Sequence, residues 1–527
     1  MTPSAKLSLV GAAIFALASA ASANPPILAP NASDVDRIVQ EGKNRNQVTK
    51  HLWHLTQKIG PRLTGSPGLA KAQTWAVGQF KKFGLKNARL EQWGDVPVGF
   101  ERGKRQIGRM VSPFPSDFEF TTMNWTPGTK GLVRAEAKRV PKSLEELNAN
   151  KDAYKGAWIV VSRPAGMRGP MTLTDEVNKA LDEVGIAGRI FGAPDERVHS
   201  SGSWRDKTYE KRPTQVGITV RKEDFDRITR NIDFGRKPVL EFDIENKWIK
   251  GPVKQYNVVA DIPGTDLKDE IVVVCGHLDS WNSPGSRGTC DNGTGTVAAM
   301  EAARILLAAK VQPRRTIRFI LWSGEEQGLL GSRAYVDANK ANIDKFVAVL
   351  NDDGGTNYQG GYTGLPEHKE ILEAAFAPTV KAFPEMPMTF DAPARLNIAG
   401  SSDHAPFAWA GVPAYFTKEV GRSNYGKVWH TQFDRYEFAI PEYLVQSSTN
   451  HAVVAYHLAT IDARLARFPK TERVAMDAKA LKAVGSDMVY EDHDHDPTKP
   501  HDHEDDFVLE LIDRLKRTAG GLIRSIR

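Results

Sequence analysis

Two histidines and a series of carboxylates are spaced along the second half of the chain in a pattern that could bind metal ions. In chain order the candidates are His277, Asp279, Asp291, Glu325, Glu326, Asp352, Asp353 and His430. Imidazole nitrogens and carboxylate oxygens suit a borderline-soft divalent ion, above all zinc. The chain has only 2 cysteines, which argues against a structural zinc site built from thiolates. If the fold brings these side chains together, the pattern predicts zinc chemistry.

Most of the candidates follow apolar runs that are typical of buried strands. Residues 271–275, 317–322 and 346–350 are almost continuously apolar, as expected of strands covered on both faces of a mostly parallel sheet. Helical patterns at 293–309 and 331–339 alternate with these runs. The alternation predicts an α/β fold with a mostly parallel central sheet flanked by helices. Its site should lie at the carboxyl ends of the strands.

Each candidate has a structural alternative when it is taken alone. An isolated His277 is more often a buried core histidine than a ligand. The doublet of Glu325 and Glu326 could be a solvated helix N-terminus, where the helix dipole favours acidic side chains. Both glutamates, however, follow a buried strand and a Ser-Gly pair at 323–324. The constellation as a whole favours a metal ligand and a neighbouring general base.

Seven stretches that carry these residues resemble, in order and spacing, the co-catalytic di-zinc exopeptidases, a family of secreted aminopeptidases and glutamate carboxypeptidases. The resemblance covers residues 36–95 and 250–465, and it implies the zinc exopeptidase fold. The matching stretches are IGPRLTGSPG (59–68), GHLDS (276–280), DNGTGTVAAMEAARIL (291–306), SGEEQGLLGS (323–332), NDDGGT (351–356), SSDHAPFAWAGVPA (401–414) and WHTQFD (429–434).

This resemblance assigns the metal ligands residue by residue. It implies two zinc ions per chain, with His277 and Asp353 on one, Glu326 and His430 on the other, and Asp291 bridging both. Two zinc ions about 3.5–4 Å apart share a water molecule and lower its pKa to roughly 7. We therefore predict zinc as the cofactor.

Neighbouring residues receive roles around that water. Glu325 would be the general base, which takes a proton from the water and hands it to the leaving amine. We expect Asp279 to accept the second imidazole N–H of His277 and so to fix its tautomer, and Asp434 to do the same for His430.

Three further residues are less firmly assigned. The family pattern, an acid before a small residue, Gly and Thr, selects Asp353 as the ligand, and Asp352 stays the alternative. His404 lies in the SDH stretch and is expected to support the pocket wall rather than to bind zinc. Tyr425, five residues before His430, is a candidate donor to the oxyanion.

The two cysteines lie next to predicted metal ligands. Cys275 precedes His277 by two residues, and Cys290 directly precedes Asp291. Both should therefore approach the same site, where a disulfide and a pair of buried free thiols are both open. Two cysteines are too few for a disulfide scaffold, so core packing must hold the fold.

Length and composition indicate several folded parts. At roughly 150 residues per domain, 527 residues correspond to three or four domains. A loop at 59–67 should separate two helices. From 96 to 250 the chain becomes rich in Pro, Gly and charge, with short strand-like runs such as 157–161, and it resembles the β-rich protease-associated domain that such enzymes carry. The predicted units are a signal peptide (1–23), the N-terminal part of the catalytic domain (24–95), the inserted region (96–250), the catalytic zinc peptidase domain (251–465) and a C-terminal extension (466–527).

The two ends of the chain carry patterns of their own. An apolar run after Lys6, followed by Ala-Ser-Ala at 21–23, fits a secretory signal of bacterial type and predicts a periplasmic or secreted protein. A membrane anchor is the alternative, but the run is shorter than the about 18 residues that a span requires. Residues 491–506 alternate His and Asp, which predicts disorder, either as a loose zinc buffer or as a spacer. An amphipathic helix is expected over 507–527.

The predicted activity is the hydrolysis of terminal bonds of peptides. An aminopeptidase needs acidic groups for the substrate ammonium, whereas a carboxypeptidase needs Arg or Lys for the terminal carboxylate. Arg395 and Arg422 lie in loops near the site stretches and do not decide between them. We predict an aminopeptidase, with a carboxypeptidase or dipeptidase of the same family as the alternative.

Other functions fit the sequence less well. A glutaminyl cyclase-like acyl transferase would use one zinc on the same scaffold, whereas GHLDS and NDDGGT favour two metals. A non-catalytic relative would lack ligands, and all five are present. No GxSxG elbow supports a serine hydrolase. The balance of 70 basic and 64 acidic residues leaves a net charge of only +6 without a basic tract, which argues against nucleic-acid binding.

Overall fold

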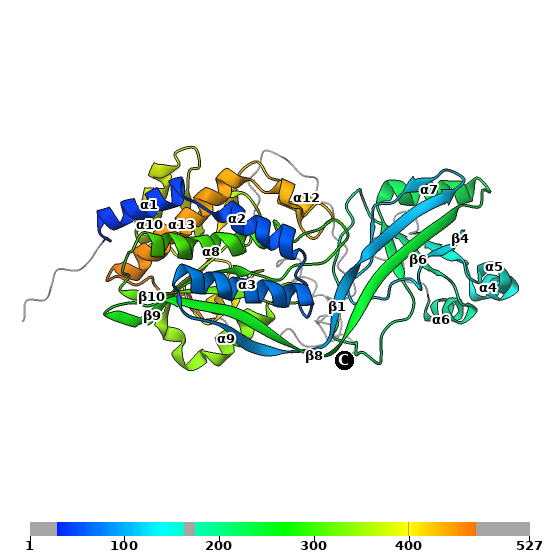
Figure 1. Cartoon of the computed structure of the whole chain (residues 1–527), viewed down its shortest axis with the longest axis horizontal. Helices are drawn as coiled ribbons and strands as arrows, with labels where there is room; N and C mark the ends of the chain where they lie inside the picture. The colour runs from blue at the N-terminus through cyan, green and yellow to red at the C-terminus, as the bar shows by residue number, and fades with distance from the viewer. Residues whose placement is uncertain (1–28, 163–173, 399, 471–527) are drawn as a thin grey trace, which may run out of the picture.

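A mixed sheet of twelve strands runs through the protein and joins a larger part to a smaller one (Figure 1). The computed structural model describes residues 29–162, 174–398 and 400–470. The predictions of a signal peptide, a His/Asp-rich tract and a terminal helix fall outside these residues. None of the helices in the described ranges combines the length and apolarity needed to cross a membrane.

The larger part contains the predicted α/β core. Its four parallel strands lie in the order β14-β11-β9-β10. All six residues of β11 and most of β10 are buried, which explains their continuous apolar sequence. The predicted strands and the alternating helices are thus confirmed. The strands are β9 (Leu267–His277), β10 (Arg315–Trp322), β11 (Phe346–Asn351) and β14 (Ala414–Phe416).

Helices cover both faces of this core. In Figure 1, α3, α8 and α13 lie on one side of β9 and β10, and α9 lies on the other. Helix α3 begins with Ser66, whose hydroxyl accepts the Leu69 N–H, and ends at Gly84, whose φ of +103° terminates the helix. The helices are α1 (Ala32–Asn44), α2 (Val48–Trp53) with a π-helical turn η1 (His54–Ile59), α3 (Pro67–Phe83), α8 (Gly293–Ala308), α9 (Leu330–Ala338) and α13 (Pro441–Thr460).

Two long antiparallel strands cross from the larger part to the smaller one. Strand β1 (Lys86–Ser112) pairs with β8 (Val239–Ile262) along nearly its whole length. One end of β8 also pairs with β10 and the other end with β4. Because charged residues and glycines interrupt their apolar pattern, neither long strand was predicted. The proposed boundaries at residues 96 and 250 fall within this ribbon.

The inserted region contains helices as well as strands, and its elements include the helix expected near 177–188 and the strands expected at 189–191 and 215–220. Its strands β4 to β7 pair in parallel, and a separate hydrophobic cluster fills the space around Trp158 and Phe242. These elements are β4 (Val133–Arg139), α4 (Leu144–Ala149), α5 (Lys151–Tyr154), β5 (Trp158–Val161), α6 (Asp175–Val184), β6 (Gly188–Gly192), β7 (Gly217–Val220) and α7 (Lys222–Asp233).

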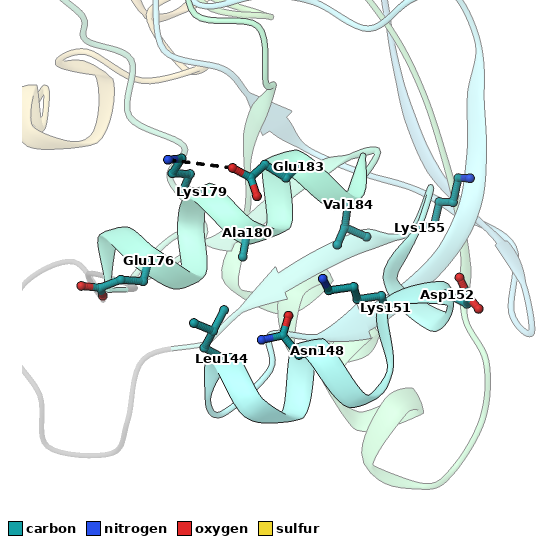
Figure 2. A pocket seen from close by; sticks show the side chains of 10 residues that line it. All are labelled: Leu144, Asn148, Lys151, Asp152, Lys155, Glu176, Lys179, Ala180, Glu183 and Val184. Carbon is teal, nitrogen blue, oxygen red and sulfur yellow. Dashed lines mark ion pairs between the residues drawn. The ribbon is translucent and has the colours of Figure 1, made fainter.

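A surface pocket lies between α4, α5 and α6 of the inserted region (Figure 2). Its walls mix Lys151, Lys155 and Lys179 with Glu176 and Glu183, and the Lys179 ammonium lies 3.9 Å from the Glu183 carboxylate. Neighbouring charges of opposite sign leave no single electrostatic preference for a ligand there.

Short elements complete the described fold. Strands β12, β13 and β15 form a small second sheet. The short elements are β2 (Ser116–Asp117), β3 (Phe120–Thr121), η2 (Lys340–Lys345), β12 (Tyr358–Thr363), η3 (Pro366–His368), α10 (Lys369–Ala382), β13 (Thr389–Asp391), α11 (Ala405–Trp409), β15 (Lys418–Val420), α12 (Tyr425–Val428) and η4 (Tyr436–Phe438).

Candidate metal centre

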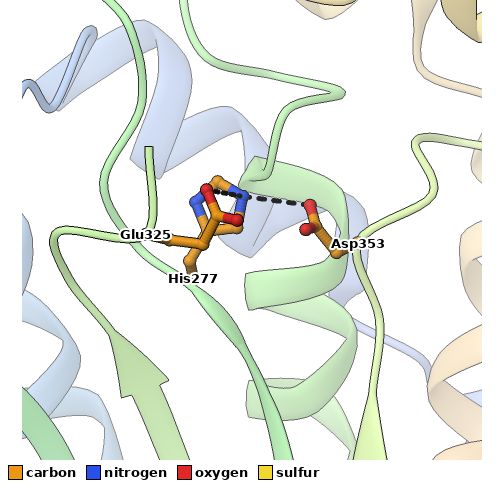
Figure 3. Close-up of side chains that lie close together, drawn as sticks. All are labelled: His277, Glu325 and Asp353. Atoms are coloured by element: carbon orange, nitrogen blue, oxygen red, sulfur yellow. Dashed lines mark hydrogen bonds and ion pairs between the residues drawn. The ribbon is translucent and has the colours of Figure 1, made fainter. Parts of the chain in front are cut away.

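The sheet brings the predicted ligands to one place. Strand β9 has β10 on one side and β11 on the other, so the direction in which the chain winds reverses at β9. Open α/β sheets bind ligands at the carboxyl ends of strands at such a reversal. His277 is the last residue of β9, and Asp353 follows the end of β11 by two residues. Figure 3 shows these two side chains together with Glu325 from the loop after β10.

One half of the centre is formed around His277. Its Nε2 lies 3.0 Å from Asp353 Oδ1 and 3.3 Å from Asp291 Oδ1. Glu325 Oε2 lies 3.8 Å from the same nitrogen. The His277 side chain is 1% exposed, whereas Glu325 and Asp353 are 11% and 10% exposed. The accessible side of this half is therefore the side of the two carboxylates.

The other half is formed around His430. Its Nε2 lies 3.0 Å from Glu326 Oε2 and 3.2 Å from Asp291 Oδ2. The two oxygens of Asp291 thus face the two histidines separately, as a carboxylate that bridges two ions would. Glu326 Oε1 accepts the backbone N–H of Trp281 at 3.1 Å, which fixes the orientation of this carboxylate.

The residues present fit a divalent metal. Two overlapping groups, His277 with Glu325 and Asp353 and His277 with Asp291 and Glu326, each bring three ligand atoms within 4.8 Å of one another. Oδ2 of Asp291 is buried without a hydrogen-bond partner among the described residues, although an imidazole faces it. Buried carboxylates and imidazoles of this kind are the ligands that zinc prefers.

Burial and neighbouring charges shift the pKa values of the residues in the cluster. Burial raises the pKa of Glu326 to about 7 and raises the pKa of Glu325 well above its usual range. Burial alone would lower the pKa of His430, but Glu326 and Asp291 raise it to about 9. The pKa of His277 is raised as well, because the charges of its carboxylate neighbours outweigh its burial. Positive charge is therefore favoured at the centre of the cluster.

Of the two predicted partners of the histidines, Asp279 lies beside His277 and helps to raise its pKa, whereas Asp434 contacts other groups. The Nδ1 atom of His277 lies 3.0 Å from the backbone carbonyl of Asp279 and 3.7 Å from its carboxylate. That carboxylate accepts the Thr64 hydroxyl at 2.8 Å. The prediction for Asp434 is wrong: its carboxylate accepts the backbone N–H groups at 289 and 290 instead of an N–H of His430. The loop before α8 needs those acceptors because its amides are buried.

Asp352 lies behind the centre rather than in it. Its Oδ2 accepts the Gln359 side-chain amide at 2.7 Å and lies 3.3 Å from His451 Nε2. Its carbonyl accepts the Asn292 side-chain amide at 2.7 Å, which links the loops that carry Asp291 and Asp353.

The cysteines are free and buried, so the structure favours the reading as two small buried side chains. Cys275 Sγ lies 3.3 Å from Asn351 Oδ1, at the end of β11. The ring of His404 packs against that of Phe416, with 5.4 Å between the ring centroids, as expected for a residue in the pocket wall.

Tyr425 lies beside the cluster. Its ring contacts Gly355, where a Cβ would come within 2.6 Å of Tyr425 Cδ2. Burial raises the pKa of this phenol, and Asp291, Asp353 and Glu326 raise it further. The tyrosine therefore stays protonated, as a hydrogen-bond donor must.

The role of Arg62 was not predicted from the sequence. The side chain is fully buried and donates to the carbonyls of Gly60, Leu278, Arg287 and Gly288 at 2.6–3.1 Å. It thereby holds the loop after β9 in place. Its position inside the IGPRLTGSPG stretch was the only available signal.

Comparisons with known proteins agree with this geometry. The model of peptidase family M28 matches residues 257–455. Carboxypeptidase Q of Mus musculus is 30% identical over 339 residues, which cover 63% of this chain and 70% of the relative. Carboxypeptidase Q of Xenopus laevis is 27% identical over 83% of this chain and 91% of the relative. Leucine aminopeptidase 1 of Pyrenophora tritici-repentis is 31% identical over 40% of this chain and 57% of the relative.

Solved structures share the fold. A peptidase M28 precursor from Shewanella amazonensis superposes with a TM-score of 0.60 at 22% identity, covering 83% of this chain and 99% of that structure. A zinc aminopeptidase from Bacillus subtilis superposes with a TM-score of 0.51 at 21% identity, covering 80% and 97%. With its α/β sheet and its clustered histidines and carboxylates, the chain belongs to peptidase family M28, the zinc-dependent exopeptidases.

Proposed function

We propose that the protein is a zinc aminopeptidase that binds two zinc ions through His277, Asp291, Glu326, Asp353 and His430. The observation that carries the choice of terminus is the acidity of the cluster. The strongest electrostatic influences on its four carboxyl groups come from two histidines and from other acidic side chains. Bound zinc would offset the charge of the ligand carboxylates, so the preference rests on carboxyl groups that zinc does not bind, such as Glu325, which can accept hydrogen bonds from a substrate ammonium.

Two further buried carboxyl groups lie near the cluster and can accept hydrogen bonds from the same ammonium, although burial favours their neutral form. Burial raises the pKa of Asp403 to about 8, with Asp279 and Asp353 contributing. Burial also raises the pKa of Glu419, and the neighbouring Asp352 and Asp353 raise it further. By contrast, the guanidinium of Arg62 is committed to backbone carbonyls below the site and is not available to a substrate.

The chain's own residues then divide the reaction between them. Glu325 is close to His277 and partly exposed, so it can take a proton from water and return it to the leaving amine. Zinc ions held here would supply Lewis acidity for the water and for the peptide carbonyl. Tyr425 would donate a hydrogen bond from its phenol O–H to the developing oxyanion.

The alternative is a carboxypeptidase or dipeptidase. It is favoured by the names of the carboxypeptidase Q relatives, which align over more of this chain than the leucine aminopeptidase does. A cyclase-like acyl transferase would bind a single zinc. Export from the cell and a protease-associated role for the inserted region stay predictions.

Matched peptides test the proposal directly. One tripeptide is acetylated at its N-terminus, a second is amidated at its C-terminus, and cleavage is measured together with zinc per chain. We expect two zinc ions, cleavage of the amidated peptide and none of the acetylated one. Cleavage of the acetylated peptide alone would establish a carboxypeptidase, and cleavage of neither, with free dipeptides still hydrolysed, would establish a dipeptidase.

A further inference from the structure

A segment of the inserted region contacts the loop that carries His430. The backbone N–H of Ser200 donates to the His430 carbonyl at 2.7 Å. His199 and Thr431 form an isolated antiparallel bridge next to this hydrogen bond. Two segments more than two hundred residues apart thus pair through their backbones directly at a predicted metal ligand.

The side chain of Gln432 strengthens this contact. Its Oε1 accepts the Val198 N–H at 2.9 Å, and its Nε2 donates to the Glu196 carbonyl at 2.9 Å. Arg197 donates to the Gly426 carbonyl at 2.9 Å. Gln432 is 1% exposed, so losing either hydrogen bond would leave a buried polar group unsatisfied.

The inserted region also holds the two loops next to Glu326. Arg205 donates to the Gln327 carbonyl at 2.6 Å. Arg102 donates to the Asn282 carbonyl through Nε and Nη2 at 3.1 and 3.0 Å. Asn282 directly follows Trp281, whose backbone N–H donates to Glu326. Three contacts from one region therefore end at the carbonyls of 282, 327 and 430.

The backbone at His430 shows why this support is needed. Its φ is +57°, in the left-handed region that side chains other than glycine rarely adopt. Such a conformation persists only where surrounding contacts impose it. His277, by contrast, ends a regular strand, and its carbonyl accepts the Thr296 hydroxyl from α8.

We infer that residues 195–205, with Arg102, form a brace that positions His430 and Glu326, so that the inserted region controls one of the two metal positions. The inference rests on the proposed assignment of these two ligands to one zinc ion. Gln432 and Arg205 are then positioning residues: they act on the metal through its ligands. Substitutions of residues that support metal ligands weaken metal binding by about 10- to 100-fold.

The test compares zinc binding in two brace variants, one at Arg205 within the brace and one at its contact residue Gln432, with that in two controls. Gln432→Leu removes both side-chain hydrogen bonds of a buried glutamine. Its control, Gln73→Leu, removes the hydrogen bond that another buried glutamine donates to the Tyr256 carbonyl on β8, without a contact to the His430 loop. Arg205→Met removes the donor to Gln327, and Arg139→Met removes an arginine that pairs with Asp233 on the inserted region.

Zinc per chain is measured at a series of buffered free-zinc concentrations, with circular dichroism as the check on folding. We expect Gln432→Leu to bind one zinc ion at least about tenfold more weakly and to retain the other. Arg205→Met should show a smaller loss of affinity for the same ion. Both controls should match wild type. Because Arg205 is at the surface, that variant tests the inference even if Gln432→Leu does not fold.

Two results would overturn the brace: unchanged zinc binding in the folded brace variants, or equal weakening of both ions. A wild type that binds a single zinc ion would contradict the two-zinc proposal instead. In that case a weaker affinity for the single ion in the brace variants alone would still support the brace, and an unchanged affinity would refute it.

Discussion

The two halves of the metal centre are held in different ways. His277 and Asp353 are placed by neighbouring parallel strands, β9 and β11, inside one hydrophobic core. His430 lies in a loop with a left-handed backbone, and contacts from the inserted region support it. A regular sheet thus provides one half, and long-range hydrogen bonds provide the other.

The difference shows which ligands the packing of the sheet positions and which need additional hydrogen bonds. Strand ends are fixed by the packing of many apolar side chains, so a single substitution nearby shifts them little. A loop ligand depends on a few hydrogen bonds, each contributing about 1 kcal/mol. The His430 half should therefore be the more easily disturbed of the two.

The largest effect is expected from Glu325→Gln. Because Glu325 lies at the His277 half and would move the proton, kcat should fall by about 100- to 10,000-fold, while zinc per chain stays that of wild type. Steady-state kinetics and metal analysis check this together. A variant that keeps more than a tenth of the activity would remove Glu325 as the base, and loss of zinc would make it a ligand instead.

A smaller loss is expected from Tyr425→Phe. Removal of one oxyanion donor typically lowers kcat by about 100-fold. Because Tyr425 packs on Gly355 through its ring, phenylalanine keeps the packing and removes only the hydroxyl. The KM should change little. An unchanged kcat would exclude Tyr425 as the donor, and Tyr436→Phe, at a tyrosine outside the cluster, is the matched control.

Alanine at each histidine compares the stabilities of the two halves. In the metal-free protein His277→Ala should lower the free energy of unfolding by about 3 kcal/mol, because it leaves buried carboxylates without their partner. His430→Ala should cost less, since this side chain is more exposed. Urea unfolding in the presence of chelator measures both. A larger loss of unfolding free energy in His430→Ala than in His277→Ala would contradict this prediction.

The smallest effect is the pH dependence of the metal-free protein. Folding raises the pKa of Glu326 to about 7 and of Asp434 to about 8, mainly through burial, and that of His430 to about 9 through its carboxylate neighbours despite burial. Because the folded state then holds more protons than the unfolded state, this contribution to stability is lost as the pH rises towards about 9. Melting temperatures in chelator should fall between about pH 6 and about pH 9. A melting temperature that rises between these pH values would contradict the raised pKa values of these groups. Zinc-loaded protein is the control.

Most of the first half of the centre could be predicted from the sequence. A continuously apolar run ending in His277 and another ending before Asp353 specify buried neighbouring strands, and their ends must meet. In the second half, Glu326 follows a buried strand, but His430 was assigned only through the resemblance of the WHTQFD stretch, because nothing in its local pattern places a loop against β9. The error at Asp434 has the same origin, since its hydrogen-bond partners are backbone amides that no spacing reveals.

The long strands escaped prediction for a related reason. Strand β1 has buried apolar residues only from Val96 onwards, such as Val98 and Phe100, and most of its other residues are exposed or half-buried, so much of its stabilisation comes from backbone pairing with β8. Local propensity is weak evidence for a strand whose partner lies about 150 residues further along the chain. The sequence therefore predicted an inserted region without showing how it is attached, and the structure shows that a paired ribbon attaches it.

That ribbon has a mechanical consequence. The chain passes from the larger part to the smaller one in β1 and returns in β8. Because these two strands are hydrogen-bonded to each other, the connection is stiffer than two separate linkers would be. Its register shifts at five places, and three of them lie in the middle of β1: between Gln92 and Gly94, between Val96 and Val98, and between Arg102 and Gln106. Irregular pairing is where a β-ribbon bends and twists most easily. Any change in the distance between the inserted region and the zinc ligands should therefore concentrate at these irregularities.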